Sequence, residues 1–138
     1  MSVLSQLNWL AIAAAAVGYF ILGGLWYSVL FDKQWMKLTG INANNPEAKK
    51  GAGGIMFFTL VLEFITCIGI AAVAYMLYFK GIGSAIKLGL LTGVCFSAIG
   101  ICISYLYQMR PKALHMIDAG HHILGNIVAA IIICNWPW

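Results

Sequence analysis

Charged side chains are scarce in this sequence, which holds 8 Lys and Arg and 4 Asp and Glu among 138 residues. Only 9% of the residues are charged, whereas about a quarter are charged in a soluble globular domain. Hydrophobic residues make up 62% of the chain. This composition excludes an ordinary soluble domain and predicts a protein whose main solvent is lipid.

The sequence also lacks the motifs that carry common chemistry. It has no Walker loop, no dinucleotide fingerprint and no nucleophile elbow around its serines. Its four cysteines lie in apolar stretches without zinc or CxxC spacing, and we interpret them as small packing residues. We therefore expect no catalytic residues and no cofactor, and the sequence favours a protein that is not an enzyme.

Long apolar runs dominate what remains. A bilayer core of about 30 Å requires about 20 apolar helical residues per crossing, so about four crossings use nearly the whole chain. We predict an all-α polytopic membrane protein, with residues 1–138 forming one antiparallel bundle in the lipid bilayer. The expected transmembrane helices are 8–30, 55–79, 82–107 and 113–136, with a loop at 31–54. Trp35, Met36 and Leu38 suggest a short interfacial helix within that loop.

The basic residues predict the orientation of the chain. The loop at 31–54 and the link before the fourth segment carry six Lys and Arg, while Lys80 and Lys87 are the two elsewhere. By the positive-inside rule, the loop at 31–54 is cytoplasmic and both termini lie outside, in a bacterial inner membrane. The net charge of +4 is thus explained by topology, and we expect no nucleic-acid partner.

One stretch carries a family pattern. The run GGLWYS at 23–28 is followed by Phe31 and then by WMKLTG at 35–40. This pattern, together with the histidine-rich start of the fourth segment, resembles a widespread family of small bacterial membrane proteins of unknown function. The resemblance covers most of the chain. It implies a four-helix membrane protein and brings no established chemistry with it.

Polar residues inside the apolar segments are the informative ones, because an ionisable side chain near the bilayer centre costs about 2.5–3.5 kcal/mol on insertion scales. Glu63 lies inside the second segment, with Thr59, Thr66 and Cys67 on its face at helical spacing. In the fourth segment, His121 points about 100° away from a polar stripe, toward small residues. That stripe consists of His115, Asp118, His122 and Asn126.

These groups are predicted to meet at one depth. The second and fourth segments begin on the same side, so Glu63 and the adjacent histidines His121 and His122 should lie at similar depths. Tyr27, Ser28 and Ser104 reach this level from the opposite direction. The sequence therefore predicts a polar pocket in the cytoplasmic half of the bundle, with a mostly aliphatic outer half.

Each of these residues also has a structural interpretation. Glu63 could bond to a Ser, Thr or backbone carbonyl, His115 could lie among headgroups, and Arg110 or Lys112 could neutralise Asp118. The glycines of the third segment, including Gly89 and Gly93, could pack helices within one chain or between chains. Metal binding is left open, because the acids and histidines are competent ligands but follow no dedicated metal motif.

The functional hypothesis is a small transporter or ion conduit. Glu63 and His122 would bind or relay protons or a small cation with help from Asp118, and their protonation would act as the switch. A four-helix bundle has little interior, so transport implies a homo-oligomer or larger assembly. Two alternatives stay open: an accessory or assembly subunit of a larger membrane complex, and a metal-dependent membrane enzyme.

Overall fold

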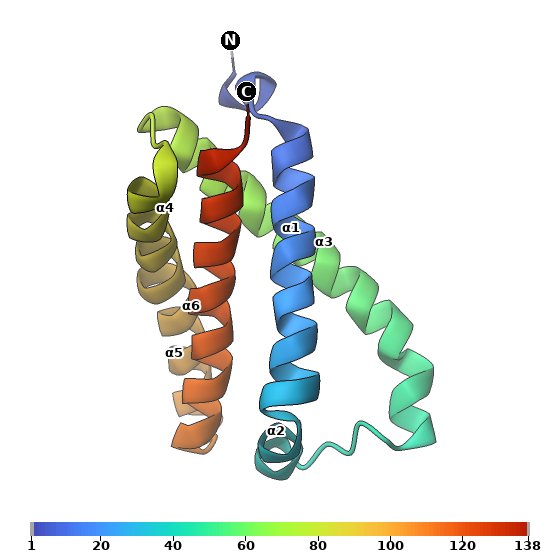
Figure 1. Ribbon diagram of the computed structural model, residues 1–138. Helices are drawn as coiled ribbons and strands as arrows, with labels where there is room; N and C mark the ends of the chain where they lie inside the picture. Colours follow the sequence, from blue (N-terminus) through green and yellow to red (C-terminus); the bar gives the residue numbers. More distant parts are fainter. Residues whose placement is uncertain (1, 138) are drawn as a thin grey trace.

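The protein is an all-α bundle of membrane-spanning helices. The computed structural model describes residues 2–137, and within this range it contains helices and no strand (Figure 1). Four helical stretches in that range are long and apolar enough to cross a membrane: Trp9–Leu30, Pro46–Met76, Gly81–Tyr107 and Lys112–Asn135. The predicted four-helix polytopic architecture is confirmed.

The first span consists of α1 (Trp9–Leu25) and a π-helical continuation, η2 (Trp26–Leu30), after a short 3-10 turn, η1 (Val3–Gln6). The side chain of Asn8 caps α1 by accepting the backbone N–H of Ala11 at 3.1 Å. Directly after η2 comes the short helix α2 (Asp32–Thr39), which ends at Gly40 with φ 74°. It occupies the position where the sequence predicts a short helix.

The second span, α3 (Pro46–Met76), begins well before residue 55, where the apolar run starts. The helix thus starts ahead of the predicted second segment at 55–79, and its first turns take up the end of the predicted loop at 31–54. The Asn45 side chain accepts the N–H of Glu47 at 3.2 Å, and Pro46 occupies the first helical position. This cap starts the helix ahead of the glycines at 51–54, whose poor helix propensity it overrides.

The third span is α4 (Gly81–Leu90), a π-helical stretch η3 (Leu91–Ala98) and α5 (Ile99–Tyr107). It packs along α6 (Lys112–Asn135), the central helix. Half of the most apolar 18-residue stretch of α6 is buried, against 22–28% of the corresponding stretches of the other spans. A Cβ on Gly89 would overlap Ile127, and one on Gly93 would lie 2.8 Å from the Cα of Ile123. These two glycines therefore pack helices within one chain.

The bundle has two unlike halves. The half that holds the start of α1 and the end of α6 is closed by small and aliphatic side chains. Its fully buried members include Ala11, Ile12, Ala15, Ala16, Ala85, Leu88, Ala129 and Ala130. In the other half α3 crosses the bundle obliquely, so its first turns lie away from α1, at the same end of the bundle as α2 (Figure 1). The outward faces of all four spans carry large exposed apolar side chains, which fits a lipid environment.

Candidate functional site

A cavity of about 870 Å³ occupies the half of the bundle near α2. Side chains from α1, η2, α2, α3, α5 and α6 line it, together with residues 41 and 43 of the connection. Its ionisable and hydroxyl-bearing lining residues are Tyr27, Ser28, Thr39, Thr59, Glu63, Ser104, Tyr105, Arg110, Asp118, His121 and His122. The polar residues that the sequence predicts at one depth therefore belong to all four spans and line the same cavity.

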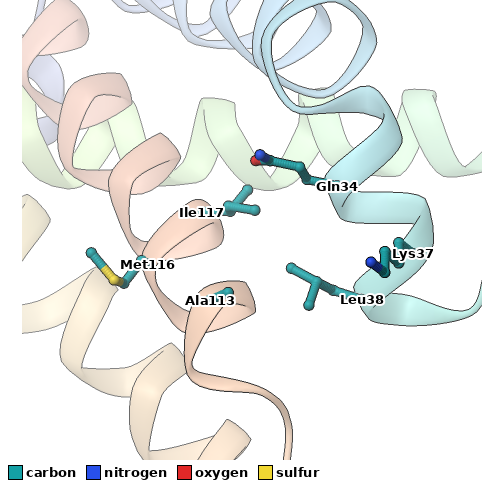
Figure 2. A pocket seen from close by; sticks show the side chains of 6 residues that line it. All are labelled: Gln34, Lys37, Leu38, Ala113, Met116 and Ile117. Carbon is teal, nitrogen blue, oxygen red and sulfur yellow. The ribbon is translucent and has the colours of Figure 1, made fainter.

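A second, smaller cavity of about 350 Å³ lies between α2 and the start of α6. Figure 2 shows Gln34, Lys37 and Leu38 of α2 on one side, and Ala113, Met116 and Ile117 of α6 on the other. It has neither an acid nor a histidine in its lining. We therefore place the candidate site in the larger cavity.

Asp118 is held by two tyrosines. The Tyr27 hydroxyl donates to Oδ1 at 2.6 Å, and the Tyr105 hydroxyl donates to Oδ2 at 2.5 Å. The residue is 5% exposed. Both of these short hydrogen bonds come from neutral donors, and neutralisation of this acid by Arg110 or Lys112 stays a prediction. Asp118 links the first span to α5 and α6.

The π-helical stretch η2 brings two consecutive aromatic residues to α6. Tyr27 bonds to Asp118, while the Trp26 indole N–H donates to the backbone oxygen of Ile117 at 2.9 Å. Consecutive residues of a regular α-helix point about 100° apart. Widened π-helical turns often occur at functional sites, and here the contacts of Trp26 with Ile117 and of Tyr27 with Asp118 are both made from such a turn.

The direct hydrogen-bonding contact of the His122 ring is with Tyr19, while Asp118, which the sequence predicts will orient or charge this imidazole, lies close enough to interact with it electrostatically. Nδ1 of His122 lies 2.7 Å from the Tyr19 hydroxyl. The Asn126 amide nitrogen donates to the His122 backbone oxygen at 2.7 Å and also lies 3.3 Å from the hydroxyls of Tyr19 and Ser97. The Tyr19 hydroxyl also donates to the His122 backbone oxygen at 3.5 Å, so this hydroxyl contacts both the ring and the backbone of His122.

His121 lies in a box of aromatic rings. The ring centroids of Tyr19, Tyr27 and His122 are 5.5, 5.1 and 4.8 Å from its own. The residue is 5% exposed, and neither ring nitrogen has a hydrogen-bond partner within residues 2–137. A Cβ at Gly23 would lie 3.0 Å from Nε2, so a glycine at this position of α1 leaves room for the imidazole.

Glu63 is the acid without a polar partner. It is 6% exposed and lines the cavity, and its Oε2 is buried with no hydrogen-bond partner in the described part of the chain. Thr59 and Thr66 donate to the backbone oxygens of their own helix, at 2.7 and 3.1 Å. The interpretation that a nearby hydroxyl satisfies Glu63 is therefore not supported, since these two hydroxyls are already engaged.

The remaining predicted residues lie at the edges. Ser28 and Ser104 line the cavity as exposed residues. His115 does not line it, and its ring packs against Tyr105 at a centroid distance of 5.4 Å. Across residues 2–137, no group of three or more His, Cys, Asp or Glu side chains lies close enough together to hold a metal ion.

Sequence reasoning missed Tyr19 and Tyr105, which hold His122 and Asp118 in place. A signal for Tyr19 was present, because Tyr19, Gly23 and Tyr27 follow at intervals of four and so lie along one side of a helix. Nothing local marks Tyr105, which follows Ser104 in an apolar run. Its role depends on the packing of α5 against α6.

Comparison with known proteins adds a family. No curated protein and no solved structure matches the chain. One family model matches residues 10–134, a range that covers all four spans except Trp9 and Asn135 and includes every residue that lines the cavity. The chain therefore belongs to the family described as protein of unknown function (DUF1761).

Proposed function

We propose that this membrane protein is a small transporter that binds a proton or small cation at Glu63, within the cavity beside α2. The observation that carries the proposal is the unpaired, buried Oε2 of Glu63 in a residue that faces the cavity. A buried carboxyl without a partner is costly in lipid, and intramembrane acids commonly mark ion or proton pathways. A bound cation would supply the missing partner.

Asp118 and His122 have supporting roles in this proposal. Both oxygens of Asp118 already accept tyrosine hydroxyls, and Nδ1 of His122 already faces Tyr19. These contacts leave Glu63 as the buried acid with free acceptor capacity. Asp118 and His122 would hold the cavity wall in shape, and Nε2 of His122 would be the group left for proton exchange.

The interior of a single chain is sufficient for binding. One copy contains a cavity of about 870 Å³, which is large enough to hold a cation although it is not a conduction path. The opposite half is closed by packed alanines and aliphatic side chains. Release on that side would require either a movement of helices or a second copy of the chain, so the homo-oligomer remains part of the transport proposal.

An accessory subunit is the second candidate, and exposed small residues favour it. A Cβ added at Gly69 or Gly83 would meet nothing within 4 Å, and neither glycine lines the cavity. Such open glycines on membrane helices permit close approach of another helix. In this proposal they would dock onto a larger membrane complex, and the buried polar groups would only fix the fold.

Flux into liposomes tests the transport proposal. Native protein would be compared with Glu63→Gln, which removes the charge at nearly constant size, with His122→Ala and with Glu47→Gln. Glu47 is the matched control, because it lies on the same helix but is exposed and outside the cavity. We expect proton or cation flux from the native protein and Glu47→Gln, with at least a tenfold loss in Glu63→Gln.

Folded native protein without flux under any ion or pH gradient would contradict transport. Stoichiometric co-purification with one larger membrane complex, in the absence of flux, would support the accessory role instead.

A further inference from the structure

The size of the cavity argues against a bare inorganic ion as its main occupant. Pockets for drug-sized molecules have volumes of about 300–1,000 Å³. The cavity, at about 870 Å³, falls within this range. A dehydrated metal ion needs only a small shell of six to eight oxygens. The space around Glu63 is therefore large enough for an organic molecule.

The chemistry of the walls points the same way. Aromatic rings at Phe20, Tyr27, Trp35 and Tyr105 line the cavity, and its other lining residues are largely aliphatic or small. The described residues offer no cluster of three His, Cys, Asp or Glu side chains that could replace the water shell of a metal ion. A weakly hydrated organic cation needs no such cluster, because aromatic faces and one carboxylate suffice to bind it.

The charges of the lining favour a cation at depth. Among the described lining residues, Glu63 and Asp118 are the acids and Arg110 is the basic residue apart from the two histidines. Both acids are buried, whereas Arg110 is exposed and its Nε donates to the side chain of Gln108 at 3.3 Å. Water and salt screen an exposed charge far more than a buried one, so a cation at the inner end would meet the two acids with little screening and little repulsion from Arg110.

We propose that the cavity binds a lipophilic organic cation, whose charge lies at Glu63 and whose apolar groups lie against the aromatic and aliphatic walls. This inference rests on the transport and on the positive charge at Glu63 that the proposed function assumes, and it replaces the small cation by a larger organic one. The oblique course of α3 places its first turns and the connection at 41–43 along the same cavity. Entry would therefore occur from the end of the bundle near α2.

Binding of tetraphenylphosphonium tests the inference directly. Full-length protein in nanodiscs would be titrated with this cation by calorimetry, and triphenylphosphine oxide would serve as a neutral compound of related shape. We expect saturable binding of the cation by native protein and by Glu47→Gln, and at least tenfold weaker binding by Glu63→Gln. Arg110→Gln should bind as tightly as native protein or more tightly, because it removes a like charge.

Three outcomes would overturn the inference: no binding by folded native protein, equal binding by Glu63→Gln, or equal binding of the neutral compound. Proton flux without tetraphenylphosphonium binding would refute the substrate class and leave the proposed transport intact. Glu63-dependent binding without any flux would support the ligand class and refute transport. Circular dichroism of each variant confirms that lost binding does not come from lost folding.

Discussion

The contact between Gly125 and Tyr19 is the point at which one added methyl group should disturb the site most. Gly125 lies on α6 against the Tyr19 ring, and a Cβ there would overlap ring atoms. The substitution Gly125→Ala must therefore displace Tyr19. Because the Tyr19 hydroxyl contacts Nδ1 of His122 and the amide of Asn126, the displacement also breaks the network that orients His122.

The expected magnitude follows from three contributions. Alanine in place of glycine stabilises a helix interior by about 1 kcal/mol. Overpacking a filled site costs about 1–3 kcal/mol, and two lost hydrogen bonds cost about 1 kcal/mol each. The net loss in the free energy of unfolding is therefore about 2–4 kcal/mol. For Gly100→Ala, where nothing lies within 4 Å, only the first contribution applies and stability should rise by up to about 1 kcal/mol.

Unfolding in mixed detergent micelles, titrated with sodium dodecyl sulfate and followed by circular dichroism, gives both free energies. The opposite signs of the two glycine substitutions are the decisive feature. Equal stability of Gly125→Ala and Gly100→Ala would refute the close packing of Tyr19 on α6. A destabilised Gly125→Ala that still binds ligand like native protein would refute the link between Tyr19 and the site.

Two further predictions concern Asp118 and the topology. Tyr27→Phe and Tyr105→Phe should each lower the unfolding free energy by about 1.5–3 kcal/mol, as expected for the loss of a hydrogen bond to a carboxylate. The control is Tyr107→Phe, which should change this free energy little because Tyr107 is exposed. The effects of Tyr27→Phe and Tyr105→Phe in the double variant should be non-additive, since both hydroxyls bond to one carboxyl; strict additivity would contradict the shared contact. A cysteine at Asn44 in a cysteine-free background should react with a membrane-impermeant maleimide only after the cytoplasmic face is opened, and labelling of intact cells would reverse the predicted orientation.

The sequence predicts part of the site and misses its connections. The positions of Glu63, Asp118, His121 and His122 within apolar segments were sufficient to predict a polar pocket in one half of the bundle. Their partners were not predictable from helical spacing. Asp118 bonds to Tyr27 across 91 positions in the chain, and His122 contacts Tyr19 across 103. Spacing within one helix suggested Asp118 as the partner of His122, and it gave no sign that the direct contact of this ring would be with Tyr19.

The number of spans was determined by the sequence alone, because the length and apolarity of a segment are local properties that the fixed thickness of the bilayer converts into crossings. The early start of α3 depended on a cap at Asn45 and Pro46, a local signal that the hydrophobic pattern does not contain. The cavity, the free carboxyl oxygen of Glu63 and the paired state of Asp118 were decided by the tertiary structure. They depend on the oblique packing of α3 and on the widened turn at η2, and both follow from how helices fit together in three dimensions.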